Sequence, residues 1–296
     1  MLVSVVLAGC GAGGTDAADV RVTGKFGERP VVQPQGEQPK KPQVDMVSTG
    51  SGRVVKQGEI VIADIEIRVW KGNREYLSTY SGAGHPNSVI MDGTHVSRTW
   101  DQALVGKKIG SRVVLSSPAS EGFGPSHLPP SGTTQKDALI VVFDILGSYN
   151  PDVAADGKKT KDASEQDTSL PTVSVDSSGI PRIKFPDGPA VKSATARTLL
   201  EGEGRKVTAG DTVIVQFVHQ EWKAENPDQT SYQPHAPRAF DLDGEGVPES
   251  WKKFVVGASV GSRLVIAEPG NPSNADDPGG AFVIDIVDVV RKADQK

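Results

Sequence analysis

The apolar and polar positions of this chain follow one pattern that is written twice. Residues 100–115 run from a tryptophan through a short apolar stretch and Val-Gly to Gly-Ser-Arg and a strand-like run, and residues 251–266 repeat this order. A second pair of similar blocks starts at Gly50 and at Gly202. The two offsets, 251 − 100 = 151 and 202 − 50 = 152, are nearly equal. A period this long indicates two duplicated domains rather than the ~20–50-residue repeats of a solenoid.

Each repeat unit predicts strands around one short helix. Residues 58–70 are apolar on both faces, which favours a central strand. Ser97 is a typical helix N-cap and Gly106 a typical helix stop, so the helix that carries Trp100 has barely two turns. Because so short a helix is unstable alone, a sheet must hold it. Pro248 is expected at the first position of the second helix, a favoured place for proline.

The predicted strands follow the same order in both units. In the first unit they cover residues 20–32, 58–70, 76–80, 88–91, 112–115 and 138–149. In the second unit they cover residues 173–185, 210–222, 239–242, 263–267 and 281–290, with a polar loop at 225–237 in place of the strand at 76–80. We therefore expect an α+β fold in which each unit is an antiparallel, twisted β-sheet half-barrel wrapped around one short helix.

Composition narrows the function classes. The formal net charge is −5, so no basic surface argues for nucleic acid as a partner. The 33 glycines and 21 prolines favour strands joined by turns. Aromatic residues make up only 5% of the chain, so each large aromatic side chain is a candidate core anchor or pocket wall.

The chain has one cysteine, Cys10, so it cannot form an internal disulfide. Cys10 follows an apolar run at residues 2–7 and the tripeptide Leu7-Ala8-Gly9, which resembles a bacterial lipoprotein lipobox. The resemblance implies a lipidated Cys10 and an anchor on the extracytoplasmic face of the cell membrane. The run is short and no Lys or Arg precedes it, which a start codon assigned too far downstream would explain. The alternative is an unmodified cysteine in a disordered tail.

These observations divide the chain into four segments. They are a lipoprotein signal and tether at residues 1–19, a first domain with an N-terminal extension at 20–150, a flexible linker at 151–172 and a second, more divergent domain at 173–296. The linker is expected because residues 150–169 have almost no large apolar side chain.

Candidate catalytic groups are sparse. The histidines share no ligand spacing with the cysteine or with paired carboxylates; they are His85, His95, His127, His219 and His235. Neither a phosphate loop, nor a nucleophile elbow, nor an acid–base pair stands out. The sequence therefore predicts no metal, no cofactor and no covalent catalysis.

What remains is the tryptophan helix, and its motif resembles a known family. The pattern V-x-x-x-W-x-x-x-[LV]-x-G-x-x-x-G-S-R occurs at residues 96–112 and 247–263, and Glu-Gly-Phe-Gly-Pro follows at residues 121–125. Together with the strand at 58–70, it resembles FKBP-type peptidyl-prolyl cis–trans isomerases over about 45–150 and 190–290. Two such domains behind a lipobox are similar to lipoproteins of Gram-positive actinobacteria.

The resemblance implies a mechanism. A peptidyl-proline ring would rest on the tryptophan in an apolar cleft, where the twisted amide loses resonance and is favoured over the planar one. The uncatalysed barrier is ~18–20 kcal/mol. The implied partners are proline-containing unfolded or exported polypeptides, and the implied state is a monomer. The implied role is to assist folding of exported proteins.

The family motif implies a set of substrate-binding residues in the first domain. They are Ile65, Tyr76, Leu77, Val96, Ser97, Trp100, Phe123, Leu128 and Val141. Trp100 would be the cleft floor, and the backbone N–H of Ser97 would reach a substrate carbonyl. The chain departs from the family where Leu77 replaces an aspartate, Phe123 a tyrosine and Ile65 an aromatic residue.

The second domain departs further. Its implied cleft consists of Phe217, Val247, Trp251 and Phe282. Pro248 takes the place of Ser97 and has no N–H to donate. The loop at 268–279 is also about ten residues shorter than the loop at 116–136, so we expect the first domain to be the better isomerase.

Two alternatives stay open. The first is a catalytically decayed lipoprotein that binds clients or partners through FKBP-like folds without turnover. The second is that Trp100 and Trp251 are plain core residues with no open cleft. A transport-type binding lipoprotein is disfavoured because the chain lacks the helices of two large α/β lobes.

Overall fold

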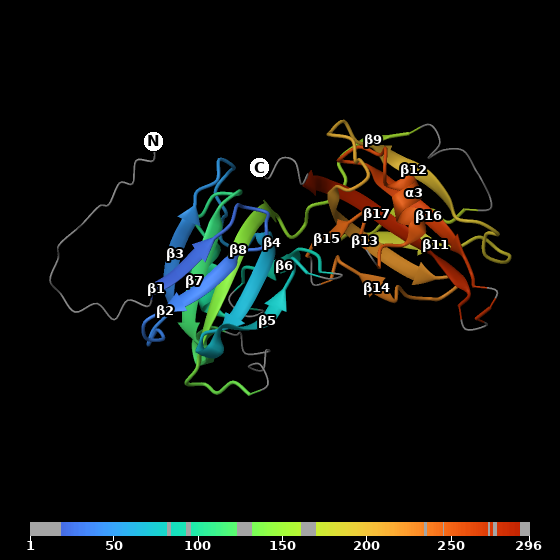
Figure 1. The fold of residues 1–296 in the computed structure, drawn as a ribbon. Helices are drawn as coiled ribbons and strands as arrows, with labels where there is room; N and C mark the ends of the chain where they lie inside the picture. Colours follow the sequence, from blue (N-terminus) through green and yellow to red (C-terminus); the bar gives the residue numbers. More distant parts are fainter. Residues whose placement is uncertain are drawn as a thin grey trace.

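The computed structural model describes residues 19–81, 84–92, 96–122, 132–160, 170–233, 236–244, 246–271, 273–274 and 277–290. Within these ranges the chain forms two antiparallel β-sheets side by side, each curved around a short helix (Figure 1). The predicted fold class and the predicted duplication are therefore confirmed.

The first sheet has six strands in the order β3-β7-β8-β4-β5, with β6 also paired to β4. Its strands are β3 (Gln43–Ser48), β4 (Ile60–Val69), β5 (Arg74–Ser78), β6 (Asn87–Ile90), β7 (Arg112–Pro118) and β8 (Ala138–Tyr149). The helical segments are η1 (Lys71–Asn73), α1 (Arg98–Leu104) and α2 (Ala119–Gly122). β4 is central, as its two apolar faces predict.

The second sheet has seven strands in the order β14-β13-β17-β16-β12-β9, with β15 also paired to β13. Its strands are β9 (Lys158–Lys159), β12 (Thr195–Glu201), β13 (Thr212–Glu221), β14 (Gln229–Thr230), β15 (Arg238–Asp241), β16 (Arg263–Pro269) and β17 (Gly279–Val290). Its helix is α3 (Glu249–Phe254). Strand β14, which corresponds to β5, has only two residues, and the sequence predicts neither β14 nor β12.

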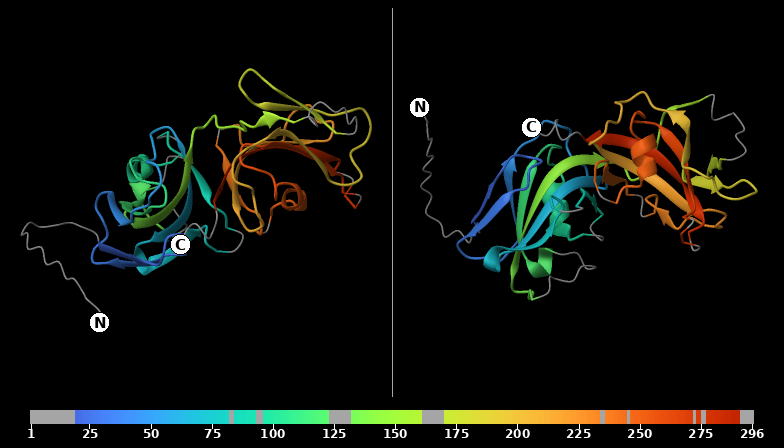
Figure 2. Two further views of the ribbon diagram at one scale, coloured as in Figure 1. Left: turned by 90° about the horizontal axis from the view of Figure 1, so that it is seen from above. Right: turned by 45° about the vertical axis from the view of Figure 1, so that its right-hand side comes forward.

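A two-stranded hairpin precedes each sheet. The first pairs β1 (Asp19–Thr23) with β2 (Val31–Gln35), and the second pairs β10 (Thr172–Val175) with β11 (Pro181–Lys184). The duplication thus extends upstream of the glycine blocks, as the sequence predicts. The first hairpin lies against the face of the first sheet opposite α1 (Figure 2). Val32 of this hairpin packs on that face, and Ile180 and Ile183 of the second unit's hairpin region pack against Val218 of β13.

The two covered faces explain the continuous apolar sequence of β8. Val141 and Phe143 join the cluster around α1, whereas Ile140 and Val142 join the cluster under the hairpin. Successive residues of a strand point to opposite faces, so a strand covered on both sides must be apolar at nearly every position.

The two helix starts have the same backbone and different caps. Ser97 is the N-cap of α1, and its hydroxyl accepts a hydrogen bond from the Thr99 N–H at 3.3 Å. Pro248 is the N-cap of α3 and has no side-chain cap. The prediction of Pro248 at the first helical position is therefore wrong by one residue. Its φ of −57°, within the range that the proline ring fixes, suits the N-cap, where Ser97 has −58°.

Part of the predicted flexible linker is ordered against the second domain. The Pro151 carbonyl accepts a hydrogen bond from Gln216 Nε2 at 3.0 Å, and the Gly157 N–H donates to the Gly261 carbonyl at 2.9 Å. Strand β9 then pairs with the edge strand β12. The prediction failed here because backbone groups can pair with a sheet whatever side chains they carry. Residues 161–169 lie outside the described residues.

Candidate functional site

Trp100 lies on α1 above the concave face of the first sheet. Its indole is partly buried and meets the Phe143 ring edge-on, with centroids 4.9 Å apart and an interplanar angle of 77°. Ile65 of β4 and Val141 of β8 belong to the same apolar cluster. A tryptophan held in this way keeps part of its surface available above an apolar wall.

Hydrogen bonds fix α1 to the start of the segment after β7. The Trp100 indole N–H donates to the Gly122 carbonyl at 2.8 Å, and the Thr99 hydroxyl donates to the Glu121 carbonyl at 2.9 Å. The Ser97 hydroxyl also donates to the Glu121 carbonyl. Helix α2 therefore sets the orientation of Trp100 through the indole N–H.

The structure brings together most of the first-domain residues that the family motif implies. The cluster around α1 includes Ile65, Leu77, Val96, Trp100 and Val141. Ser97 lies at the start of the same helix. Phe123 and Leu128 fall outside the described residues.

Tyr76 does not join this cluster. Its side chain is 40% exposed, whereas its neighbour Leu77 packs against the core. The register between β4 and β5 shifts here, so that Ile67 is opposite Leu77 and Arg68 is opposite Glu75. Tyr76 is thus the extra residue of a β-bulge, which re-aims the side chains around it. The structure places Leu77, not Tyr76, on the wall near Trp100.

Phe143 was not among the residues predicted from the sequence, although its position in β8 points to it. Phe143 lies two residues after Val141 on β8, and residues two apart share one face of a strand. Ile65 also has a fixed position, because its N–H donates to the Thr79 hydroxyl at 2.9 Å. In the second domain the Phe217 N–H donates to the Ser231 hydroxyl at 2.8 Å in the same way.

Trp251, the counterpart of Trp100, is sealed. It is 1% exposed, and three phenyl rings surround it edge-on: Phe217 at 5.9 Å, Phe240 at 5.0 Å and Phe282 at 5.4 Å between centroids. Val247 packs in the same cluster. The implied second-domain residues are therefore together, with Phe240 as a member that the sequence analysis missed.

The indole N–H of Trp251 has no hydrogen-bond partner among the described residues. In the first domain the acceptor comes from α2, and the described part of the chain after β16 contains no such helix. Instead, the Ser250 hydroxyl donates to a carboxylate oxygen of Glu268. The described part of this loop therefore offers Trp251 no counterpart of the bond from Trp100 to Gly122.

The buried carboxylate of Asp144 lies on the face of the first sheet opposite Trp100. Asp144 of β8 is buried and accepts hydrogen bonds from Arg112 Nε at 2.7 Å and from the Tyr80 hydroxyl at 2.8 Å. Burial and the Asp144 charge raise the pKa of Tyr80. Because Asp144 follows Phe143, its side chain lies on the opposite face of the sheet. This ion pair is part of the fold and not of the site.

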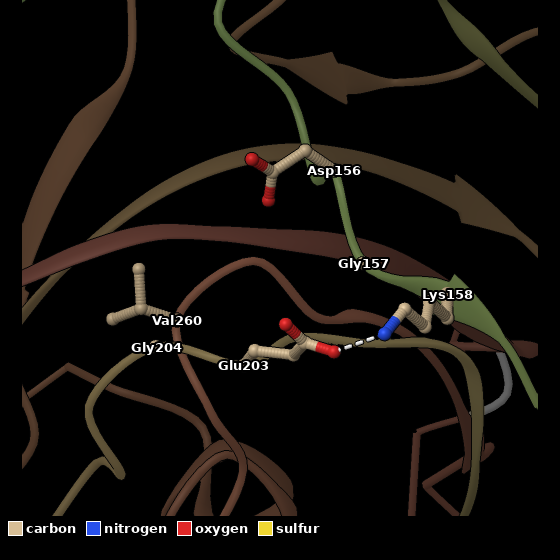
Figure 3. Close-up of a pocket in the computed structure, with 6 residues that line it drawn as sticks. All are labelled: Asp156, Gly157, Lys158, Glu203, Gly204 and Val260. Atoms are coloured by element: carbon tan, nitrogen blue, oxygen red, sulfur yellow. Dashed lines mark hydrogen bonds and ion pairs between the residues drawn. The ribbon is translucent and has the colours of Figure 1, made fainter.

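A hollow of about 280 Å³ lies between the linker and the second sheet (Figure 3). Asp156, Lys158, Glu203 and Val260 line it, together with two glycines. Lys158 and Glu203 form an ion pair, but their side chains are 82% and 75% exposed. Exposed pairs contribute little, and the hollow holds no buried polar group, so it is a weak candidate beside Trp100.

Known proteins resemble the first domain. Residues 52–146 match the model of the FKBP-type peptidyl-prolyl cis–trans isomerase family. A curated "FK506-binding protein" of Streptomyces anulatus is 27% identical over 119 residues, which cover 37% of this chain and 96% of that protein. Over residues 52–146 the first domain is therefore similar to FKBP-type peptidyl-prolyl cis–trans isomerases.

Three solved structures match parts of this chain at low overall similarity. The three FKBP domains of wheat FKBP73 match at a TM-score of 0.32 and 15% identity, covering 85% of this chain and 95% of that one. FkpA from Escherichia coli matches at 0.31 and 22% identity, covering 36% and 48%. A putative isomerase, FKBP12, from Mycobacterium tuberculosis matches at 0.29 and 21% identity, covering 38% and 88%.

Proposed function

We propose that the first domain catalyses cis–trans isomerisation of X-Pro bonds in polypeptides, with Trp100 as the floor of the site. One observation carries the proposal: within the stretch that matches the isomerase family, Trp100 is partly exposed above the apolar wall of Ile65, Val141 and Phe143. The first domain would accelerate X-Pro isomerisation, which takes tens of seconds uncatalysed.

The residues of the site act by environment rather than by proton transfer. Planar amides are stabilised by resonance and by water, and the twisted transition state loses the resonance. An apolar wall beside the indole withdraws water from the planar form and leaves the twisted form less affected. The bond from Trp100 to Gly122 keeps the indole in place while the amide turns.

For the second domain we propose binding or support without turnover. Trp251 is enclosed by phenyl rings, and Pro248 lacks the N–H that Ser97 offers at the same backbone position. A proline ring could reach the Trp251 face only if Phe217, Phe240 or Phe282 moved. A tightly packed core resists such movement.

We also propose that the protein is a lipid-anchored lipoprotein that assists the folding of exported proteins. The support is the position of Cys10 after Leu7-Ala8-Gly9. No helix in the described ranges is long and apolar enough to cross a bilayer. Expression with a labelled fatty acid would test the anchor: label on the wild type and none on Cys10→Ser is expected, and equal label on both would contradict it.

The test of the catalytic proposal is the rate of cis-to-trans conversion of a short X-Pro peptide by the full chain. We expect acceleration by the wild type and a loss of at least ~10-fold in kcat/KM for Trp100→Ala, because the indole is lost at the reacting bond. Trp251→Phe serves as the control and should retain the rate. A folded wild type without acceleration would leave binding alone as the function.

A further inference from the structure

The two domains share an apolar interface. The first domain contributes Ile62, Leu146 and Tyr149 to it, and the second contributes Ile214, Ala239, Val287 and Val290. Ile62 and Ile214 are fully buried. Phe26, from the turn of the first hairpin, also packs against this cluster. In Figure 1, β6 of the first sheet lies next to β15 of the second, and these strands are in contact.

Equivalent positions of the duplicated units meet at this interface. Ile62 is paired with Ser88 and Gly147, and Ile214 is paired with Ala239 and Asp288 in the same register. Ile62 and Ile214 are therefore the same position of the repeat, since 62 + 152 = 214. An interface in which one patch meets its own copy is isologous, the arrangement of a two-fold dimer.

Specific polar bonds fix the relative position of the domains. The Tyr149 hydroxyl donates to Asp288 Oδ2 at 2.9 Å, and the Ser88 hydroxyl donates to the Pro237 carbonyl at 2.6 Å. Gly147 makes room for the Tyr149 ring, because a methyl group there would lie 2.7 Å from the ring carbon Cε2. Because both residues belong to β8, the missing side chain at Gly147 lets the Tyr149 ring take the position from which its hydroxyl reaches Asp288 of the second domain.

The interface continues to the segment beside the first-domain site. Leu77 at the end of β5 and Val89 in β6 both belong to the Trp100 cluster. Between them, the His85 ring lies 6.1 Å from the ring of Phe240 in the second domain. Phe240 in turn packs edge-on against Trp251. The aromatic cluster of the second domain thus contacts the segment between β5 and β6. The residues on either side of this segment, Leu77 and Val89, belong to the Trp100 cluster.

We propose that the second domain is a fixed brace that positions residues 84–90 of the first domain, through Phe240 and the Pro237 carbonyl, and thereby sets the affinity of the first-domain site for peptide. This inference rests on the proposed function. Without the brace, the peptide must order the segment as it binds. Ordering one side chain typically weakens binding about twofold to tenfold.

The test compares full-length variants. Gly147→Ala displaces Tyr149, and Ala239→Arg places a charge in the apolar interface, where Ala239 is 1% exposed. Val175→Arg, on the second hairpin at 50% exposure, is the matched control. Each protein is measured for domain orientation by residual dipolar couplings, for kcat and KM on an X-Pro peptide, and for peptide Kd by NMR titration.

We expect one common alignment tensor for both domains in the wild type and in the control. Gly147→Ala and Ala239→Arg should give two separate tensors, a KM and Kd about twofold to tenfold higher and a kcat within about twofold. A loss of folding would instead collapse the amide signals of a domain into the narrow range of an unfolded chain. Gly147→Ala is the milder of the two changes, so it tests the interface even if Ala239→Arg unfolds a domain.

Two results would overturn the brace: separate tensors in the wild type, or separated domains with an unchanged Kd. Either result leaves the proposed function standing if the wild type is active. If the wild type accelerates no isomerisation, the catalytic proposal fails, and the Kd values alone then decide the brace.

Discussion

The two tryptophans occupy the same position of a duplicated fold and have opposite surroundings. Trp100 is partly buried, meets one phenyl ring and donates its N–H to Gly122. Trp251 is 1% exposed, meets three phenyl rings and has no acceptor among the described residues. The difference arises in the segment after β7 and β16, which forms α2 in the first domain only, as far as the structure describes the chain. One fold can therefore retain or bury its site through a loop and a few neighbouring rings.

The largest expected change is a loss of free energy of unfolding when the buried ion pair that both domains share is broken. Each has a buried ion pair beneath its sheet, Arg112–Asp144 at 2.7 Å and Arg263–Asp285 at 2.6 Å. Removing one partner of a buried pair typically costs ~3–5 kcal/mol. We expect Asp144→Ala and Asp285→Ala to lower the free energy of unfolding of their domains by this amount, measured by chemical denaturation.

The first pair should be the more sensitive. Arg112 also donates to the carbonyls of Gly24 and Glu28, so it secures the turn of the first hairpin to the sheet. In the second domain the ion pair secures the linker, because Asp285 accepts a hydrogen bond from the Ala155 N–H. A cost below ~1 kcal/mol for either substitution is typical of an exposed ion pair and would contradict the claim that these pairs are buried.

Trp100→Phe and Trp251→Phe sharpen the comparison itself. Both replace an indole by a phenyl ring, and each cost is compared with the apolar area that the indole buries, which is larger for Trp251. Trp100→Phe leaves the buried Gly122 carbonyl without its donor, whereas Trp251→Phe breaks no indole hydrogen bond to a described residue. We expect the lost bond to add ~1–3 kcal/mol to the cost of Trp100→Phe in free energy of unfolding. Equal costs per buried area for the two substitutions would contradict this expectation.

The smallest expected effect is on the pH dependence of the first domain's free energy of unfolding. Burial alone would raise the pKa of Glu59, but hydrogen bonds from Arg53, the Lys56 N–H and Ser148 outweigh it and lower the pKa from 4.5 to about 2. Glu59 therefore stabilises the fold fully above pH 4.5, and this contribution is lost as the pH falls toward about 2.

Urea denaturation between pH 5 and about 2 measures this contribution. Glu59→Gln should show a shallower loss of stability over that window than the wild type, because the amide does not titrate. Parallel profiles of the two proteins would contradict the assignment. Asp211 takes the equivalent position in the second domain, since 59 + 152 = 211, and Asp211→Asn is the matched comparison.

The periodic parts of the fold could be predicted from the sequence. The duplication, the central strand β4, the short helix α1 and the final strand β8 follow from repeated blocks and from alternating apolar residues. The bulge at Tyr76 could not, because one extra residue in β5 reverses which side chain faces the core without changing the composition. Phe240 and the docked linker were missed because their partners are distant in sequence.

The sequence predicts the position of each tryptophan through its motif, but it does not predict whether the indole is open or enclosed. The pattern around Trp100 and Trp251 is the same in both units, so it cannot show that one indole is open and the other enclosed. That distinction depends on three rings from β13, β15 and β17, which only the folded sheet brings together. The interface between the domains is a further case, since the pairing of Ile62 with its own copy appears only in three dimensions.

The most direct test observes both tryptophans in one experiment. In a ¹⁵N-labelled full chain the four tryptophans each give an indole N–H signal, assigned by substitution to Phe. During titration with an X-Pro peptide, the account predicts that the Trp100 signal shifts progressively while the Trp251 signal stays in place. A shift of Trp251 at the same peptide concentration, or an unmoved Trp100, would contradict the claim that the first domain alone retains an open site.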